Sequence, residues 1–329
     1  MDYTRNEKSI ARPILIIISI VCFLVATFLA LYWWESANNK GEVAQTGNGT
    51  VQYNGVDYVK KSNIETFLIM GLDTTEVESS ADSYNNKMQA DFLLLLIFDK
   101  DTQKSSAIHI NRDTMTDMNI LGVAGQKVGT ANGQIALSHT YGNGKEVSCR
   151  NTADAVSNLL NGIKVNHYLS VTMDFVSIFN DLVGGVEVTV LDDFTSVDPS
   201  LVQGETVTLT GEQALLYVRT RRELADSSNS TRMVRQRQYL NALYEKTLQC
   251  IETNEQFIVD ATLAMGNYIV SDRSVTQLQE LAKKMTTYEF TGINTIEGES
   301  RMGEKFVEFY ASKDSITEVV MNLFYKIKE

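Results

Sequence analysis

The sequence contains little proline, cysteine or histidine, and its charge balance is acidic rather than basic. The 2 prolines in 329 residues argue against long proline-rich linkers. The 3 histidines, His109, His139 and His167, lack the spacing of a zinc site, and we interpret each of them as structural. Because nucleic-acid-binding proteins usually present a broad basic surface, the formal net charge of -12 argues against a nucleic-acid partner.

Two motifs that define common enzyme classes are also missing. No G-x-x-x-x-G-K-[ST] segment occurs, so the sequence offers no phosphate-binding loop of the nucleoside-triphosphatase kind. No G-x-S-x-G segment occurs either, which removes the serine nucleophile of that motif. Hydrophobic residues make up 43% of the chain, so most of it is expected to fold, as one large or two ordinary domains.

An uncharged apolar run occupies residues 13–34. Its length fits the roughly 20 residues that cross a bilayer core, and its last residues, Trp33 and Trp34, suit the membrane interface. Basic residues precede the run, whereas the next lysine after it is Lys40. This asymmetry predicts a cytoplasmic segment 1–12, a single transmembrane helix and an extracellular remainder in the cell membrane. A cleaved signal sequence is the alternative, although no small-residue cleavage site follows the run.

The residues after the apolar run are predicted to form a short linker followed by a folded domain. Residues 35–50 are polar and contain glycine, which is typical of a flexible linker. Strand and helix patterns interleave over residues 51–329, which predicts one large α/β domain. The expected strands are a hairpin at 50–61 that turns at Asn54-Gly55, single strands at 64–71, 91–99, 105–111 and 186–190, and a strand pair at 290–310. The continuous apolar run of the strand at 91–99 predicts cover on both of its faces. The expected helices cover residues 151–160, 174–183, 210–217 and 231–249, followed by two further helical patterns and a final helix that reaches the C-terminus. The helix at 210–217 begins with the capping-box pattern Thr210-Gly211-Glu212-Gln213.

Charged residues stand at the ends of three expected strands. Asp73 follows the first buried strand, Asp91 opens the next, and Arg112 with Asp113 closes the third. Adjacent strands could bring these ends to one edge of a sheet. Carboxylate oxygens suit Mg²⁺, which often shares the phosphate oxygens of a substrate, so the pattern predicts a magnesium and phosphate site. The alternative is that Asp73 and Asp91 only cap turns.

Arginine is concentrated in one stretch of this acidic chain, where only Glu223 and Asp226 are acidic. Planar guanidinium groups pair bidentately with phosphate oxygens and stay charged. The stretch therefore indicates a polyanionic ligand, with phosphate as the first candidate. The six arginines are Arg219, Arg221, Arg222, Arg232, Arg235 and Arg237.

The spacing divides this stretch into parts. Arg219 and Arg221 are two residues apart, so they would point the same way from an extended segment. Arg232, Arg235 and Gln236 would share one face of a helix and line the approach to the ligand. We interpret the remaining two arginines of the stretch as spectators. The alternative for the whole stretch is a solvated charged helix.

The motifs together resemble those of the LytR-CpsA-Psr family of bacterial cell-envelope proteins, over the anchor and nearly the whole external domain. Each motif is short, but their order and spacing are specific. They are IMGLD at 69–73, QADFLLLLIFD at 89–99, INRDT at 110–114, LVGGVEVTV at 182–190, LTGEQALLYVRTR at 209–221 and RMVRQRQ at 232–238.

The resemblance implies a fold and an activity. The fold is a single α-β-α domain with a central mixed β-sheet flanked by helices, outside the membrane. Family members bind a polyprenyl-pyrophosphate-linked glycopolymer, such as a teichoic acid or capsular polysaccharide, with the lipid in an apolar tunnel. They are thought to be phosphotransferases that attach this polymer to peptidoglycan. The family's older description as transcriptional attenuators keeps a non-catalytic binding or regulatory protein open, as well as a pyrophosphohydrolase.

The resemblance also implies roles for individual residues. By motif, Asp73 and Asp91 match the metal-side aspartates, with Mg²⁺ as the cofactor. Asp91 is also our choice for the general base of the acceptor hydroxyl. The pyrophosphate arginines are Arg112, Arg219 and Arg221, the polar helix face is Arg232, Arg235 and Gln236, and Asp113 orients its neighbouring arginine or the metal.

Two positions depart from the family pattern. Gln89 stands where arginine is usual two residues before Asp91, and a neutral amide can bind phosphate but adds no charge. Lys87 could compensate, or the substrate or rate could differ. Asn229 stands three residues before Arg232, where aspartate is usual. Both departures leave ligand binding better supported than turnover.

The 3 cysteines leave a disulfide open. Cys22 lies in the apolar run, where it is expected to act as a small apolar residue. Cys149 and Cys250 would lie outside the cell, in an environment that permits disulfides. They could pair, but their spacing in the sequence does not show whether they lie close enough.

Overall fold

The computed structural model describes residues 44–46, 49–75 and 86–328, and it divides into two compact units. The smaller unit consists of the described residues up to Lys60 together with residues 326–328, and the larger unit consists of those within 61–325. The predicted transmembrane helix 13–34 and most of the predicted linker lie outside the described residues. In the part of the chain that is described, no helix is long and apolar enough to cross a membrane.

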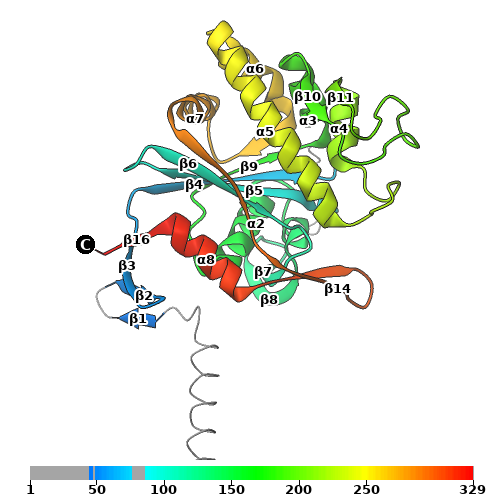
Figure 1. Cartoon of the computed structure of the whole chain (residues 1–329). Helices are drawn as coiled ribbons and strands as arrows, with labels where there is room; N and C mark the ends of the chain where they lie inside the picture. The colour runs from blue at the N-terminus through cyan, green and yellow to red at the C-terminus, as the bar shows by residue number, and fades with distance from the viewer. Residues whose placement is uncertain (1–43, 47–48, 76–85, 329) are drawn as a thin grey trace, which may run out of the picture. The chain divides into compact units, whose positions relative to one another are not determined.

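The smaller unit is built on a four-stranded sheet in the order β1-β2-β3-β16. Its predicted hairpin is confirmed, because Asn54 and Gly55 adopt left-handed φ values of 51° and 77° between two paired strands. The prediction that the last helix reaches the C-terminus is wrong, since the final residues form a strand (Figure 1). The strands are β1 (Ala44–Thr46), β2 (Thr50–Tyr53), β3 (Val56–Lys60) and β16 (Tyr325–Ile327).

The larger unit contains a six-stranded mixed sheet in the order β12-β9-β4-β5-β6-β13. Strand β5 runs antiparallel to both of its neighbours, β4 and β6, whereas β9 runs parallel to β4 and β13 runs parallel to β6. This confirms the expected central mixed sheet. Its strands are β4 (Ile64–Leu72), β5 (Ala90–Asp99), β6 (Lys104–Ile110), β9 (His167–Val171), β12 (Ile269–Ser271) and β13 (Glu289–Thr295).

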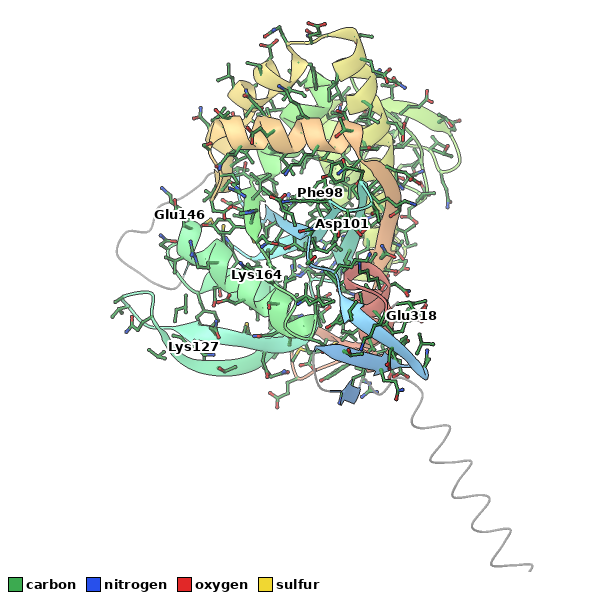
Figure 2. The ribbon with its side chains drawn as sticks, turned by 90° about the vertical axis from the view of Figure 1, so that its left-hand side faces the viewer. Phe98, Asp101, Lys127, Glu146, Lys164 and Glu318 are labelled. Carbon is green, nitrogen blue, oxygen red and sulfur yellow. The ribbon has the colours of Figure 1, made fainter. Side chains whose placement is uncertain are left out.

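Side chains of β5 alternate between the two faces of this sheet, as the period of a strand requires. Leu93 and Leu95 pack in the core that contains helices α2 (Glu146–Leu159) and α8 (Lys313–Phe324). Leu94 and Leu96 instead pack with side chains of α5 (Asn229–Thr253) and α7 (Val275–Thr287). The continuous apolar sequence of β5 therefore reflects cover on both faces, which makes the unit a three-layer α-β-α domain (Figures 1 and 2).

The layer that contains α5 and α7 also contains three shorter helices and a two-stranded sheet. Their apolar side chains form a separate core with one face of α5. The capping box predicted at Thr210 is present, with the Thr210 hydroxyl accepting from the Gln213 amide. The elements are α3 (Met173–Leu182), β10 (Val186–Thr189), β11 (Thr206–Leu209), α4 (Gly211–Arg219) and α6 (Phe257–Met265).

Several predicted boundaries differ from those in the structure. Helix α2 begins at Glu146 rather than at residue 151, and α4 continues past Tyr217 to Arg219. The strand pair expected at 290–310 begins later than predicted, because the first residues of that range belong to β13 of the main sheet. The hairpins in the structure are β7 (Met115–Leu121) with β8 (Lys127–Gln134), which was not predicted, and β14 (Gly298–Met302) with β15 (Val307–Ala311). The short 3-10 helices are η1 (Ile135–Thr140) and η2 (Gly266–Tyr268).

A charged cluster surrounds Glu65 near the start of β4 and ties α7 to the sheet. Its Oε2 lies 2.8 Å from Lys284 Nζ of α7 and 3.0 Å from Lys100 Nζ. Burial works to raise the pKa of the Glu65 carboxyl, but hydrogen bonds from Lys284 and Lys100 outweigh it and lower the pKa from 4.5 to about 2. The carboxylate form is therefore favoured in the folded state.

Because this pKa is depressed on folding, the stability that Glu65 contributes is present above pH of about 4.5 and is lost as the pH falls toward 2. We expect Glu65→Gln to lower the free energy of unfolding by about 1 kcal/mol at pH 7, after allowance for solvent screening. Denaturant unfolding of both proteins from pH 7 to pH 2 should show the difference closing below pH 5. Glu299→Gln, at an exposed pair with Arg301, is the control and should change little; a difference for Glu65→Gln that is constant with pH would contradict this account.

Candidate functional site

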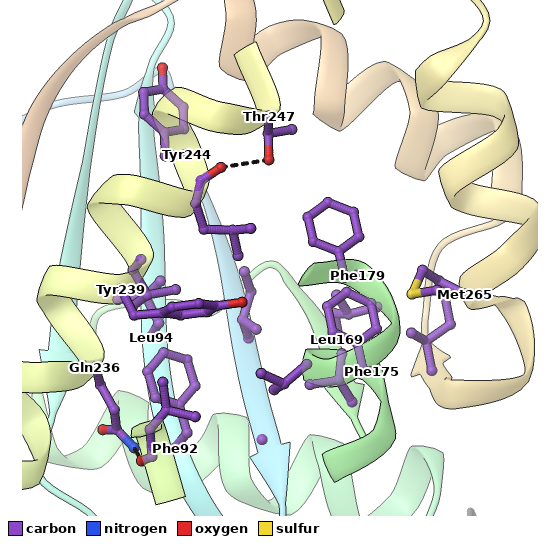
Figure 3. A pocket seen from close by; sticks show the side chains of 18 of the residues that line it. Phe92, Leu94, Leu169, Phe175, Phe179, Gln236, Tyr239, Tyr244, Thr247 and Met265 are labelled. Carbon is purple, nitrogen blue, oxygen red and sulfur yellow. Dashed lines mark hydrogen bonds between the residues drawn. The ribbon is translucent and has the colours of Figure 1, made fainter. Parts of the chain in front are cut away.

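A cavity of about 460 Å³ lies in the larger unit, between one face of the sheet and the helices above it (Figure 3). Its lining is mostly aliphatic and aromatic, with side chains from β4, β5, β9 and helices α3 to α7. An elongated apolar group is the ligand that such a lining favours. Apolar residues that line it include Phe67, Leu94, Leu96, Leu169, Phe175, Phe179, Leu243, Met265, Leu278 and Leu281.

The charged side chains of the lining come from elements that meet at one end of the cavity. Asp73 follows the end of β4, and Asp91 lies at the start of β5, the antiparallel neighbour of β4. Arg219 is the last residue of α4, and Arg232 lies in the first turn of α5. In Figure 3, Gln236 and Phe92 lie at the opposite end of the view from Tyr244 and Thr247. The cavity is therefore apolar along its length and charged at one mouth.

Arg112 is held by three side chains at this mouth. Its Nη1 contacts Asp91 Oδ1, its Nη2 donates to Gln89 Oε1 at 2.6 Å, and its Nε lies 3.3 Å from Asp113 Oδ1. The Nε contact lacks hydrogen-bond geometry, so this buried N–H has no hydrogen-bond partner. Gln89 thus serves as a neutral acceptor for Arg112, which a sequence motif alone does not reveal.

Asp113 is a buried carboxylate beside Arg112. It accepts a hydrogen bond from Gln134 Nε2 at 3.1 Å, and its backbone N–H donates to Asn111 Oδ1 at 2.9 Å. Burial raises the pKa of the Asp113 carboxyl, while Arg112 and other nearby arginines oppose the rise. Gln134 was not among the predicted site residues, because it lies at the end of β8, a strand that the sequence pattern did not predict.

Arg232 approaches Asp91 from the opposite side. Its Nη1 lies 3.7 Å from Asp91 Oδ2, and its Nη2 donates to Asn229 Oδ1 at 2.6 Å. Asn229 in turn donates to Asn111 Oδ1 at 2.7 Å, so the unusual asparagine is part of the site's hydrogen-bond network. Arg232 is only 6% exposed, and burial lowers the pKa of its guanidinium.

Two guanidinium groups therefore flank one carboxylate, and each has a buried Nε donor without a hydrogen-bond partner. Like the Nε of Arg112, the Nε of Arg232 has no hydrogen-bond partner. Since a buried donor without a partner costs free energy, these groups favour an additional acceptor, and phosphate oxygens match guanidinium forks. The predicted residues Gln89, Asp91, Arg112 and Arg232 are brought together here, although their roles in ligand binding stay predictions.

Arg219 and Asp73 form a looser pair at the same mouth. Arg219 Nη2 lies 3.5 Å from Asp73 Oδ1, and both side chains are at least half exposed. The prediction that Arg219 and Arg221 lie in one extended segment is wrong, because Arg219 is the last residue of α4 and Thr220 caps the helix. Arg221 follows this cap and is partly buried.

The residues of the polar helix face predicted on α5 have different surroundings in the structure. Gln236 lines the cavity and donates to the Val218 carbonyl oxygen at 3.1 Å. Arg235 instead contacts Asp192 and the Thr220 carbonyl oxygen, and its guanidinium lies 5.2 Å over the ring of Phe194. The prediction that Arg235 lines the approach to the ligand therefore gives way to a structural role. Arg222 and Arg237, which we interpreted as spectators, differ in their exposure to solvent. Arg222 is exposed, whereas Arg237 is half-buried.

We expect Arg235→Ala to destabilise the fold strongly. Arg235 is 1% exposed, so its removal leaves Asp192 and two carbonyl oxygens without their partner. Breaking a buried ion pair costs about 3 kcal/mol or more. Thermal unfolding should therefore show a large fall in Tm, whereas Arg219→Ala, which breaks an exposed pair, should change Tm by little. A stable Arg235→Ala protein with impaired ligand binding would reverse this assignment.

Cys149 and Cys250 are both free, so the disulfide that the sequence left open does not form. Cys149 is buried on α2 with its Sγ 3.4 Å from Ser170 Oγ, whereas Cys250 on α5 contacts the Val183 carbonyl oxygen. The two residues belong to different apolar cores. Burial raises the pKa of the Cys149 thiol to about 12, which makes it unreactive.

The donor set for a metal at the mouth consists of two carboxylates, Asp73 and Asp91. Within residues 44–46, 49–75 and 86–328, no group of three or more histidine, cysteine or acidic side chains is arranged to hold an ion. Mg²⁺ commonly binds one or two carboxylates and completes its shell with water and substrate phosphates. Asp73 and Asp91 supply two carboxylates of this kind, and a magnesium ion that binds them together with a phosphorylated ligand stays a prediction.

The chain belongs to the LytR-CpsA-Psr family. The model of that family, described as the LytR_cpsA_psr family, matches residues 30–324. The match includes the strands, helices and arginine stretch that form the cavity and its mouth.

Three similar proteins illustrate this relationship. The polyisoprenyl-teichoic acid–peptidoglycan teichoic acid transferase TagU of Bacillus licheniformis is 24% identical over 74% of this chain and 71% of its own length. Biofilm regulatory protein A of Streptococcus mutans is 24% identical over 87% of this chain and 71% of its own length. A solved structure titled "TagT bound to LIIa-WTA" superposes with a TM-score of 0.60 at 21% identity, covering 80% of this chain and 90% of that chain, and shows the shared fold.

Proposed function

We propose that this protein is a membrane-anchored phosphotransferase that faces the outside of the cell. It takes a glycopolymer from a polyprenyl-pyrophosphate carrier and attaches it to peptidoglycan. The observation that carries the proposal is an apolar cavity that ends at Arg112 and Arg232, whose buried Nε donors have no hydrogen-bond partner. A lipid pyrophosphate has this combination of a long apolar tail and a compact polyanion. The name of the related TagU supports the same activity.

The reaction makes one bond to phosphorus and breaks another. The hydroxyl oxygen of the acceptor attacks the phosphorus that carries the glycopolymer, and the bond from this phosphorus to the bridging oxygen breaks. The bridging oxygen leaves with the lipid as a polyprenyl phosphate, and negative charge develops on it. Arg112 and Arg232 stabilise this charge, because preorganised donors are strongest where water is excluded.

Asp91 has two functions in this proposal. Without ligand, it balances the charge of Arg112 and Arg232 and holds them in place. When phosphate oxygens become the partners of these arginines, one oxygen of Asp91 can accept the proton of the acceptor hydroxyl while the other remains for the metal. Mg²⁺, held by Asp73 and Asp91, would supply further positive charge to the pyrophosphate oxygens.

The transfer is tested with the full-length chain in detergent and a lipid-pyrophosphate-linked glycopolymer. Incubation with peptidoglycan should give a phosphodiester-linked product and polyprenyl phosphate, whereas incubation without it should release little lipid phosphate. Equal release in both reactions would identify a pyrophosphohydrolase. Binding without any release would identify a binding or regulatory protein, as the name of the Streptococcus mutans relative indicates for that protein.

Gln89 provides a direct test between an enzyme and a binding protein. We expect the natural protein to turn over, because Arg112 and Arg232 remain in place and Gln89 anchors Arg112. Gln89→Arg adds a cation and should tighten pyrophosphate binding by about tenfold, while removing an acceptor from Arg112. Transfer rates and lipid-pyrophosphate affinities of both proteins check this expectation. Turnover that appears only in Gln89→Arg would show that the natural protein is a binder.

A further inference from the structure

A second, polar depression of about 490 Å³ lies between the β7–β8 hairpin and the C-terminal end of α2. Figure 2 shows this hairpin, with Lys127, beside α2. Only polar side chains and one glycine line the depression, in contrast to the apolar cavity. The lining residues are Thr116, Asp117, Lys127, Thr130, Asn158, Asn161 and Gly162.

The chemistry of this lining favours an uncharged, hydroxylated ligand. Asp117 and Lys127 cancel in charge, so the depression does not attract a polyanion as the arginine mouth does. Hydroxyl and carboxamide groups donate and accept hydrogen bonds, as the hydroxyl and acetamido groups of sugars do.

Hydrogen bonds hold parts of this lining in place without a ligand. Asn158 Nδ2 donates to the Asp117 carbonyl oxygen at 2.9 Å, which ties α2 to β7. Asn132 Nδ2 donates to Asp117 Oδ1, also at 2.9 Å. Beyond α2, Asn161 and Gly162 adopt positive φ values of 55° and 80°, and this turn forms one wall. A lining that is arranged before binding loses less entropy when a ligand arrives.

The same hairpin carries part of the arginine site at its base. Gln134, the last residue of β8, donates to Asp113, and the Ala136 N–H donates to the Arg112 carbonyl oxygen just beyond it. The β7–β8 hairpin therefore links the depression to the arginine mouth. A glycan held along the hairpin would be fixed relative to the reacting phosphate.

We infer that this depression binds a neutral sugar unit of the acceptor glycan and positions its hydroxyl group for transfer. The inference rests on the proposed phosphotransferase function and adds a binding site for the second substrate. The carboxamides of Asn158 and Asn161 favour N-acetylated sugars over plain hexoses. The donor polymer is the other source of neutral sugars, and the two sources are distinguished by the probes.

The test uses the full-length chain in detergent with two soluble probes, a tetramer of N-acetylglucosamine and a tetramer of glucose. We expect the first to bind more tightly, and Asn158→Ala and the near-isosteric Thr130→Val each to weaken it by about fivefold through lost hydrogen bonds. Asn63→Ala, at an exposed asparagine that lines neither cavity, is the matched control. Tighter binding of the glucose tetramer would support a sugar site but assign it to the donor.

Two further readouts separate this inference from the proposed function. Asn158→Ala should leave lipid-pyrophosphate affinity unchanged and, in the transfer reaction, raise KM for peptidoglycan about fivefold with little effect on kcat. Transfer that proceeds with an unaltered KM, or sugar binding that is equal in Asn158→Ala, Thr130→Val and Asn63→Ala, would overturn the sugar site alone. An absence of transfer in every protein, with sugar binding still sensitive to Asn158, would overturn the phosphotransferase function and leave the sugar site.

Discussion

Replacing Arg112 by alanine is expected to lower the transfer rate by at least about 100-fold, the usual cost of removing one preorganised donor from developing charge. Arg112 contacts Asp91, Gln89 and Asp113, and its Nε is free to receive a phosphate oxygen. Its loss removes a positive charge and leaves Asp91 with one fewer partner. Rates of product formation with saturating lipid substrate, together with Tm, measure the effect.

Two further variants show which property of Arg112 accounts for the expected loss of transfer rate. Arg112→Lys keeps the charge but not the planar fork, so most of the deficit should remain. Arg222→Ala is the control. It removes an exposed arginine of the arginine-rich stretch and should leave the transfer rate unchanged. If Arg112→Ala folds and transfers at the natural rate, the arginine mouth is not where the phosphate reacts. If Arg112→Lys is fully active, charge alone suffices there.

Replacing Leu281 by tryptophan is expected to weaken binding of a long-chain polyprenyl pyrophosphate by about 100-fold. Leu281 of α7 lines the apolar cavity, so a larger ring takes space that the lipid tail would occupy. Burial of one CH₂ contributes about 0.8 kcal/mol, so exclusion of about four carbons costs about 3 kcal/mol. Titration of the full-length chain in detergent with long-chain and short-chain pyrophosphates measures the effect.

The comparison between lipids identifies the cause of this loss. A short-chain pyrophosphate that fills only the charged end should bind Leu281→Trp and the natural protein about equally. The matched control is Leu263→Trp, because Leu263 lies on α6, is 69% exposed and does not line the cavity. Equal weakening for both chain lengths would indicate general damage to the fold. Unchanged affinity for the long chain would show that the tail lies elsewhere.

The local pattern of the sequence predicted the three central strands of the main sheet, β4, β5 and β6, but not its strands β9 and β12. The uninterrupted apolar run of β5 predicted a strand covered on both faces, and its side chains alternate between two helix layers as expected. The hairpin at Asn54-Gly55 and the capping box at Thr210 were predicted for the same reason. In each case the signal that supports the prediction is contained in a few consecutive residues of the sequence.

The predictions that failed depend on contacts between distant segments. Spacing placed Arg235 beside Arg232 on a helix face, but only the packing of Phe194 and Asp192 shows that Arg235 is buried as a structural group. Likewise, Gln89 appeared as a missing charge in the sequence, whereas in the structure it is an acceptor for Arg112. The polar depression at the β7–β8 hairpin had no signal in the sequence, because neither strand was predicted.

The central claim is that the apolar cavity holds a lipid tail whose pyrophosphate lies at the arginine mouth. An experimental structure of the full-length chain with a polyprenyl pyrophosphate tests it most directly. The predicted result is continuous density along the cavity between β5 and α7, with the head group within hydrogen-bond distance of Arg112 and Arg232. An empty cavity with the lipid bound elsewhere, or a head group away from both arginines, would contradict it.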